Sequence, residues 1–255
     1  MTIKRDDLTR FLNELLTPEN YQDYGPNGLQ IEGTETIAKI AFAVSATVQS
    51  AHAAVAQGAQ ALIVHHGLFW RFHGARPLIG PFARRVFPLV RHQINLYGYH
   101  LPLDGHMEIG NAATLAQKIK LQHLEPFGEY QDATTGVQGR LSQPVIAKVL
   151  QKQLEQILDH PVILASPDPD AHIRSLGIIT GGANSQWREA LAAGLDAYVT
   201  GEMSEHDWHE SQEAGIHMFA GGHHATEQFG IQALMAKIAD TFEVECVYLP
   251  CDNPA

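Results

Sequence analysis

Short apolar runs alternate with helix-like segments along most of this chain. The runs have the length and the Val, Ile and Ala content of buried strands, and they lie at 37–44, 61–64, 94–99, 162–165, 175–180, 196–199, 215–220 and 243–248. Apolar residues at helical spacing lie between them, at 6–16, 48–56, 81–92, 111–119, 144–158, 206–213 and 225–239, with a further helix ending near 193. Parallel strands need crossover connections, which are usually helices. The alternation therefore predicts an α/β fold with mixed, largely parallel sheets flanked by helices.

One stretch, residues 125–140, interrupts this alternation with Pro126, Gly128 and Gly136. We expect it to mark a boundary between two domains. The expected organisation is a first α/β domain at 1–127 and a second at 128–255, whose segment 144–158 begins as a helix with Pro144 in its first turn.

Composition limits the classes of function. The net charge of −11 argues against general nucleic-acid binding, because neutralising phosphates needs a basic face. No apolar run approaches the roughly 20 residues that span a bilayer, and no apolar leader follows Met1. Cys246 and Cys251 are too few for a disulfide framework. We expect a cytoplasmic protein without membrane association.

Two histidine pairs follow apolar runs: His65-His66 after 61–64, and His223-His224 after 218–222. Loops at strand ends are where α/β proteins place their chemistry. The neighbouring glycines Gly67 and Gly222 allow the backbone to turn, so that both side chains of a pair can serve one site.

Two carboxylates extend this set. Glu227 lies one helical turn after His223, and Asp104 follows the run 94–99. Imidazole and carboxylate donors suit Zn, Mn, Fe or Ni without discriminating among them, and the number of donors suits two divalent ions. The alternatives are a surface His–Glu pair and an aspartate in a turn. The predicted metal ligands are His65, His66, Asp104, His223 and Glu227.

Further residues are candidates for proton transfer. Glu202 follows the run 196–199 and is a candidate general base, an anchor for a ligand, or merely a helix cap. His100 and His224 flank the proposed donors and are the other candidates for carrying protons. Phe69-Trp70 are expected in core or subunit-interface packing rather than as a platform for stacking bases.

At these positions the chain resembles the YbgI-like, Nif-three-like family, whose members are often called GTP cyclohydrolase type-two homologues. The resemblance covers residues from about 5 to 250. The matching segments are Asn27-Gly28-Leu29-Gln30, 64–70, 100–104, Gly181-Gly182-Ala183, Thr200-Gly201-Glu202 and 222–227.

The resemblance implies two interlinked α/β domains with a metal site between them. It also implies two ions held by the five predicted ligands, and a homohexameric ring whose sites face its interior. The chain corresponds to the short form, without the domain that longer members insert at mid-chain.

The expected function is a dinuclear metal-dependent hydrolase acting on a small molecule such as a nucleotide. With a GTP-like substrate, a metal-activated water would open the purine ring. The alternative is a non-catalytic, metal-stabilised ring that acts as a scaffold or regulator and binds a partner protein. Fold and metal do not fix the substrate.

Overall fold

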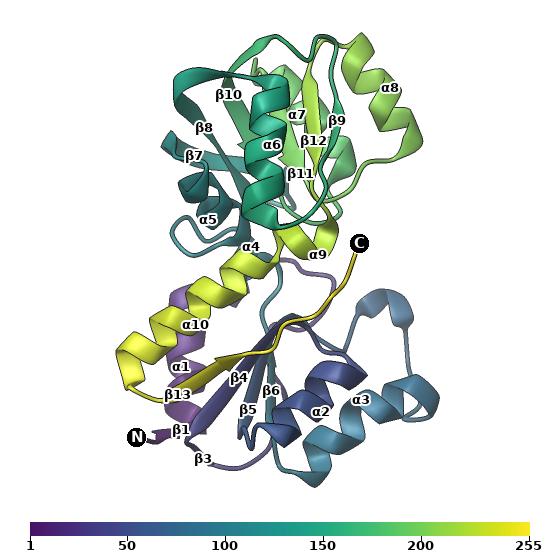
Figure 1. The fold of residues 1–255 in the computed structure, drawn as a ribbon. Coiled ribbons are helices and arrows are strands. Elements are labelled where there is room, and N and C mark those ends of the chain that lie inside the picture. Colours follow the sequence, from purple (N-terminus) through teal and green to yellow (C-terminus); the bar gives the residue numbers. More distant parts are fainter. The chain divides into compact units, whose positions relative to one another are not determined.

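The computed structural model describes residues 1–255, and the chain forms two compact α/β units (Figure 1). The first unit comprises Met1–Leu103 and Ile231–Cys251, and the second comprises Asp104–Gly230 and Asp252–Ala255. The fold class predicted from the alternation is confirmed. A single division at residue 127 would place the last strand in the second domain, whereas that strand pairs within the first unit.

The first unit is built on a five-stranded sheet of order β13-β4-β5-β6-β2. Its first four strands are mutually parallel, and β2 joins the edge in the antiparallel direction. A two-stranded antiparallel ribbon, β1-β3, accompanies it. The strands are β13 (Glu245–Tyr248), β4 (Lys39–Ser45), β5 (Ala61–His66), β6 (Asn95–Gly98), β2 (Gly28–Ile31), β1 (Ile3–Lys4) and β3 (Thr36–Ile37).

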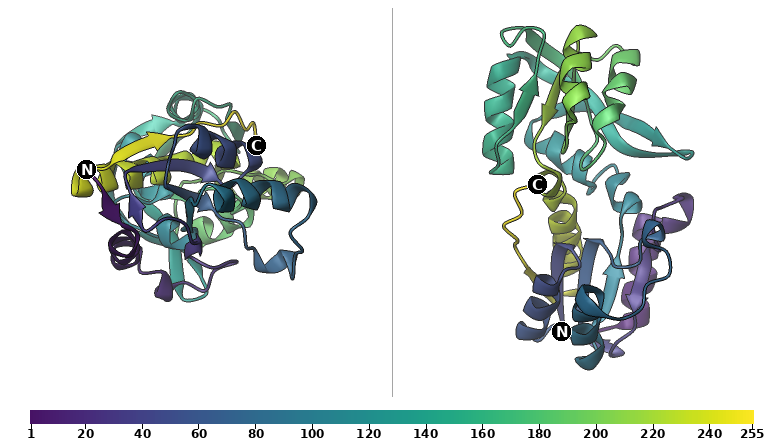
Figure 2. Two further views of the ribbon diagram at one scale, coloured as in Figure 1. Left: turned by 90° about the horizontal axis from the view of Figure 1, so that it is seen from below. Right: turned by 90° about the vertical axis from the view of Figure 1, so that its right-hand side faces the viewer.

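Helices cover both faces of this sheet (Figures 1 and 2). Side chains alternate between faces along a strand. Leu62 and Val64 of β5 accordingly pack in one buried cluster with α2 and α3, while Ile63 is fully buried on the opposite side. On that side Phe11 of α1 makes an edge-to-face contact with Phe242 of α10. The helical elements are α1 (Arg5–Leu16), η1 (Pro18–Asn20), α2 (Val48–Ala56), η2 (Arg71–His73), α3 (Gly80–Arg91), α4 (Leu101–Asp104) and α10 (Gln228–Phe242).

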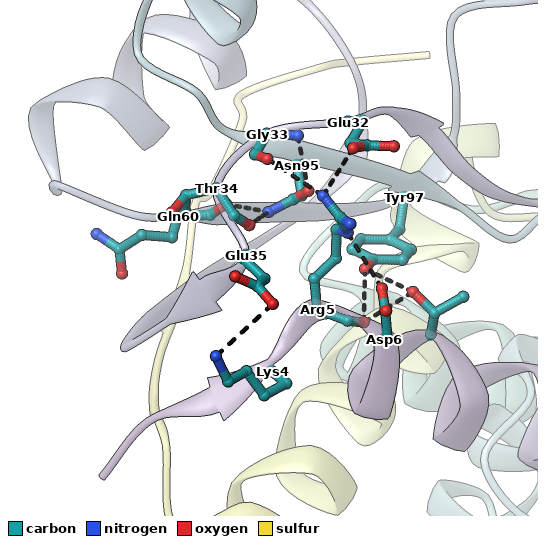
Figure 3. Close-up of polar contacts among 11 residues, drawn as sticks. Lys4, Arg5, Asp6, Glu32, Gly33, Thr34, Glu35, Gln60, Asn95 and Tyr97 are labelled. Carbon is teal, nitrogen blue, oxygen red and sulfur yellow. Dashed lines mark hydrogen bonds and ion pairs between the residues drawn. The ribbon is translucent and has the colours of Figure 1, made fainter.

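A buried asparagine fixes the start of β6, as Figure 3 shows. Asn95 is fully buried; its Oδ1 accepts a hydrogen bond from the Gly33 amide at 2.8 Å, and its Nδ2 donates to Thr34 O at 2.8 Å and Gln60 O at 3.1 Å. β6 is only four residues long, so the hydrogen bonds of its first residue also fix the position of its last residue and of His100, which follows it.

The second unit contains a six-stranded sheet of order β7-β8-β10-β11-β12-β9. Only the β10-β11 and β11-β12 pairings are parallel, so "largely parallel" describes the first sheet and not this one. The strands are β7 (Leu121–Tyr130), β8 (Ala133–Ile146), β9 (Ile163–Ala165), β10 (His172–Ile178), β11 (Ala197–Thr200) and β12 (His217–Ala220).

The stretch 125–140 interrupts the alternation of strands and helices because two consecutive strands meet in it. It forms most of a β-hairpin, because β7 and β8 pair around a two-residue turn at Gln131-Asp132. Both turn residues have positive φ, 47° and 67°, which is the twist that two-residue hairpin loops need. Pro144 does not begin a helix: β8 still pairs with β10 at Val145 and Ile146, and α6 starts at Ala147.

Helices lie on both faces of this second sheet as well, with α6 on one side and α7 and α8 on the other (Figure 2). Val199 and Phe219 pack with α5 and α6, whereas their neighbours Tyr198 and Met218 pack with Trp187 of α7. The helices are α5 (Asn111–Lys118), α6 (Ala147–Leu158), η3 (Asn184–Gln186), α7 (Trp187–Ala192), α8 (Glu205–Glu213) and α9 (His223–Thr226). No helix in the chain combines the length and the apolar character that crossing a bilayer requires.

Candidate metal centre

Three histidines gather at the carboxyl edge of the first unit's sheet. β5 ends in His65 and His66, and the neighbouring parallel strand β6 leads through Tyr99 to His100. One possible ligand atom from each of the three lies within 4.8 Å of the others. His65 is fully buried, and His66 and His100 are partly exposed. The strand pairing therefore brings together residues that are 35 positions apart in the chain.

The Nδ1 atoms of these rings all meet oxygen atoms. His65 Nδ1 donates to the Tyr99 carbonyl at 3.1 Å, and His100 Nδ1 donates to Asp23 Oδ1 at 2.7 Å. His66 Nδ1 lies 3.0 Å from Ser45 Oγ. Because a carbonyl and a carboxylate can only accept, His65 and His100 carry their protons on Nδ1, and Nε2 carries the lone pair. This tautomer is the one that orients a histidine for metal binding.

Asp23 is a functional candidate that sequence reasoning missed. Its carboxylate is nearly fully buried, and besides His100 it accepts hydrogen bonds from the amides of Tyr24 at 2.6 Å and Leu101 at 2.9 Å and from Asn27 Nδ2 at 2.9 Å. Burial alone would raise the pKa of Asp23, but the hydrogen bond from His100, helped by those from Asn27 and the Leu101 amide, holds it below its usual range. Asp23 thus remains an anion that orients His100.

The segment Asn27-Gly28-Leu29-Gln30 was a signal that could have led to Asp23. Asn27 Oδ1 accepts a hydrogen bond from the His100 amide at 2.8 Å, and Gln30 Oε1 accepts one from the Leu68 amide at 2.9 Å. The two amide side chains therefore tie this segment to both histidine-bearing loops.

In the second unit, His223 and Glu227 lie one turn apart at α9. His223 Nε2 is 3.1 Å from Glu227 Oε2, and His223 Nδ1 donates to Glu202 Oε1 at 2.5 Å. Burial would lower the pKa of His223, but the hydrogen bonds and charges of Glu227 and Glu202 raise it to about 9. Glu202 is therefore an orienting partner of His223 in this structure, which is one of the roles predicted for it.

A glycine makes room for the Glu227 carboxylate. Gly181 follows β10 with φ of 68°, and a Cβ on it would lie only 2.1 Å from Glu227 Oε1. Its amide donates to Thr226 Oγ1 at 3.1 Å, and its carbonyl accepts from the amides of Gly201 and Glu202. The Gly181-Gly182 segment thus packs against the residues that surround Glu227, which is itself only 3% exposed.

Asp104 is a buried acid with polar neighbours in the second unit. It is 7% exposed, and its Oδ1 accepts hydrogen bonds from Asn111 Nδ2 at 2.9 Å and Thr180 Oγ1 at 3.4 Å. These two hydrogen-bond donors fix the orientation of the Asp104 carboxylate. The burial of Asp104 distinguishes it from an aspartate in a surface turn.

Other candidates take structural roles. Asn184, which follows the Gly181-Gly182-Ala183 segment, donates from Nδ2 to Ser204 Oγ and Asp207 Oδ2, at 2.9 and 2.7 Å, and so links the loop after β10 to the start of α8. The amide of His224 donates to the Ala255 carbonyl at 2.9 Å. A proton-transfer role for its ring stays a prediction.

The donors in both units fit a divalent cation. They are imidazole nitrogens and carboxylate oxygens, several are buried, and the orienting oxygens of Tyr99, Asp23 and Glu202 are of the kind that accompanies metal-binding histidines. These histidine, aspartate and glutamate groups can hold metal ions, and their chemistry leaves the metal open among Zn, Mn, Fe and Ni.

Comparison with known proteins places the chain. Residues 3–254 match the model of the family described as Duf34/NIF3 (NGG1p interacting factor 3). The chain belongs to the DUF34/NIF3 family. A protein of Pasteurella multocida named GTP cyclohydrolase 1 type 2 homolog is 40% identical over 250 residues, which is 98% of each chain.

Solved structures of this family share the fold over their full length. The protein ybgI, described as of unknown function, superposes with a TM-score of 0.92 at 37% identity and covers 99% of this chain and 100% of its own. A protein of Thermus thermophilus superposes with a TM-score of 0.89 at 32% identity over 99% and 100%. The YbgI-like resemblance predicted from the motifs is confirmed.

Proposed function

We propose that this DUF34/NIF3 protein is a metal-dependent hydrolase that holds two divalent ions. The observation that carries the proposal is the pairing of histidines with acceptor-only oxygens: His65 with Tyr99 O, His100 with Asp23 and His223 with Glu202. Such pairing leaves the lone pair on Nε2, which can bind a cation at His65 and His223 and can carry a proton at His100. The proposed ligands are His65, His66, Asp104, His223 and Glu227.

Divalent ions bound to these residues would lower the pKa of a coordinated water and so supply hydroxide near neutral pH. The chain's own groups hold and move the protons. Asp23 keeps a proton on His100 Nδ1, which leaves Nε2 to accept a proton from a reacting group and stabilises the imidazolium that results. Glu202 keeps a proton on His223 Nδ1, which leaves its Nε2 for a cation. Glu202, His100 and His224 are the proposed proton carriers.

The proposed substrate is a nucleotide, supported by the name of the Pasteurella multocida relative. In ring opening, hydroxide adds to C8 of the purine, one of the bonds from C8 to a ring nitrogen breaks, and the released nitrogen takes up a proton. His100, at the edge of the sheet beside His65 and His66, is the proposed donor of that proton.

Elemental analysis of protein purified without added metal tests the ion content. We expect about two ions per chain, loss of an ion in His65→Ala or Glu227→Ala, and no loss in His52→Ala, which changes an exposed histidine of α2. The large apolar core should keep the variants folded, unlike a zinc finger. A folded wild-type protein that binds no metal would refute the proposal.

Turnover tests the chemistry. Ring opening of GTP can be monitored through the loss of the purine absorbance. The reaction should stop when a chelator removes the metal and resume when metal is restored. Metal-loaded protein that leaves GTP and other nucleotides unchanged would argue for the second candidate, a metal-stabilised scaffold that binds a partner protein. That candidate is favoured by apolar residues exposed on and before α3, such as Ile79 at 69% and Val90 at 52%. Partner binding that survives Glu202→Gln would support it.

We also propose a homohexameric ring in the cytoplasm. Trp208 is 41% exposed and Phe69 is 39% exposed, and either can contribute to subunit contacts, whereas Trp187 is buried in the second unit and cannot. Light scattering at micromolar concentration should report six chains. A monodisperse monomer would contradict the ring.

A further inference from the structure

Residues 69–80 form an exposed loop beside the three histidines of the first unit. Trp70 anchors this loop: it lines a small pocket together with His65, His100 and Asp23. Its ring meets the His100 ring edge-on, with centroids 5.1 Å apart, and lies 5.9 Å from the His66 ring. The loop is therefore continuous with the proposed metal-binding histidines.

The loop presents an aromatic surface to solvent. Phe72 is 70% exposed, and its ring stacks on Trp70 with centroids 5.7 Å apart and an interplanar angle of 16°. The base of the loop is held by Phe69, which packs edge-on against the buried Phe82. An exposed phenylalanine beside a site adds nothing to the core, and such surfaces commonly mark binding sites.

The same part of the chain is strongly basic. Residues 69–92 carry five of the 17 Lys and Arg residues and no Asp or Glu, although the whole chain has a net charge of −11. Arg71 and Arg76 lie in the exposed loop itself, and the Arg76 guanidinium sits over the Phe82 ring at 4.3 Å. Guanidinium groups bind phosphate through paired hydrogen bonds. The loop thus combines a stacking surface with anion-binding groups.

We propose that Trp70, Phe72, Arg71 and Arg76 form the nucleotide-recognition subsite of this protein. The aromatic pair stacks on the base, and the two arginines bind the phosphates. The pocket beside His65 and His100 measures about 10 Å³, room for roughly one water molecule, so the base is recognised on the aromatic pair and not inside the pocket. This assignment departs from the expectation that Trp70 serves only in packing. The choice of a nucleotide as the ligand rests on the proposed function, but binding of the nucleotide can be measured without turnover.

The test is calorimetric titration of the full-length protein with GTP, guanosine and inorganic triphosphate. Phe72→Ala should weaken GTP and guanosine binding about 5- to 150-fold, the equivalent of about 1–3 kcal/mol for one stacked base, and leave triphosphate binding unchanged. The double variant Arg71→Gln/Arg76→Gln should weaken triphosphate and GTP but not guanosine. Ile79→Ala is the matched control, because it removes an apolar side chain of similar exposure, 69%, from the same loop.

The outcomes separate this proposal from the hydrolase. GTP binding that depends on Phe72 in a protein without turnover would support the subsite and refute the hydrolase. Turnover of GTP with an unchanged KM in Phe72→Ala would support the hydrolase and refute the subsite. If Phe72→Ala instead lowers the assembled mass in light scattering and leaves GTP binding intact, the loop is a subunit interface and the subsite is refuted.

Discussion

Replacing Gly181 by alanine tests whether the position of Glu227 matters for metal binding. A Cβ at Gly181 would lie 2.1 Å from Glu227 Oε1, and ordinary contact begins at 3.4 Å, so the carboxylate has to retreat. Metal–ligand distances tolerate only about 0.2 Å. Even losing a group that merely orients a ligand costs about 10–100-fold in affinity, and we therefore expect Gly181→Ala to weaken metal binding by at least about 100-fold.

Gly194→Ala is the matched control for this change. Gly194 has the same φ, 68°, but nothing lies within 4 Å of the position its Cβ would take. Both variants should lose about 1–2 kcal/mol of stability from the left-handed backbone, since the Glu227 side chain can move aside in the first. The difference between them is then confined to the site.

Competition with a fluorescent chelator measures metal affinity, and urea denaturation measures stability. Equal metal affinity in the two alanine variants would refute Glu227 as a ligand. If Gly181→Ala fails to fold, Glu227→Gln asks the same question without backbone strain, because it keeps the volume of the side chain and removes its charge.

Three further results are expected. Asp23→Asn replaces one carboxylate oxygen by an NH2 group, which then faces the His100 and Leu101 N–H groups that the carboxylate accepts from. The free energy of unfolding in urea should therefore fall by about 1.5–3 kcal/mol. An unchanged value would show that these hydrogen bonds are not formed. Asn95→Ala leaves the buried Gly33 amide without its acceptor, and should cost about 1–3 kcal/mol in the same assay, with no change in metal content. Burial lowers the pKa of His217, an effect that the charges of Asp196 and Asp168 oppose. The unfolded chain then binds more protons than the folded chain, so the contribution of His217 to stability is fully present above about pH 6.5 and decreases as the pH falls below this value. His217→Gln should reduce the change of Tm with pH in this range. An unchanged slope of Tm against pH would contradict the lowered pKa of His217.

Local patterns were sufficient for much of this protein. The helix predicted at 48–56 is α2 (Val48–Ala56), and Thr47 and Ser50 cap it through reciprocal hydrogen bonds between neighbouring residues. The pairing of His223 with Glu227 also follows from the sequence, because residues four apart share a helix face. Such features depend on separations of a few residues, and periodicity and capping report them directly.

Other features depend on contacts between distant residues. The sequence alone shows strand-like runs ending in histidines, but only strand pairing places His100 beside His65 and His66, and only tertiary packing brings Asp23 against His100, 77 residues away. The last strand, β13, joins β4 across some 200 residues, which no local pattern encodes. The sequence did not reveal the hairpin at 121–146, because its glycines and proline suggested a domain boundary. In the structure its two strands pair with each other, and β8 also pairs with β10. Sequence therefore determined the elements and the donor types, whereas tertiary structure decided which residues orient the donors, since long-range packing and hydrogen bonding outweigh local propensity.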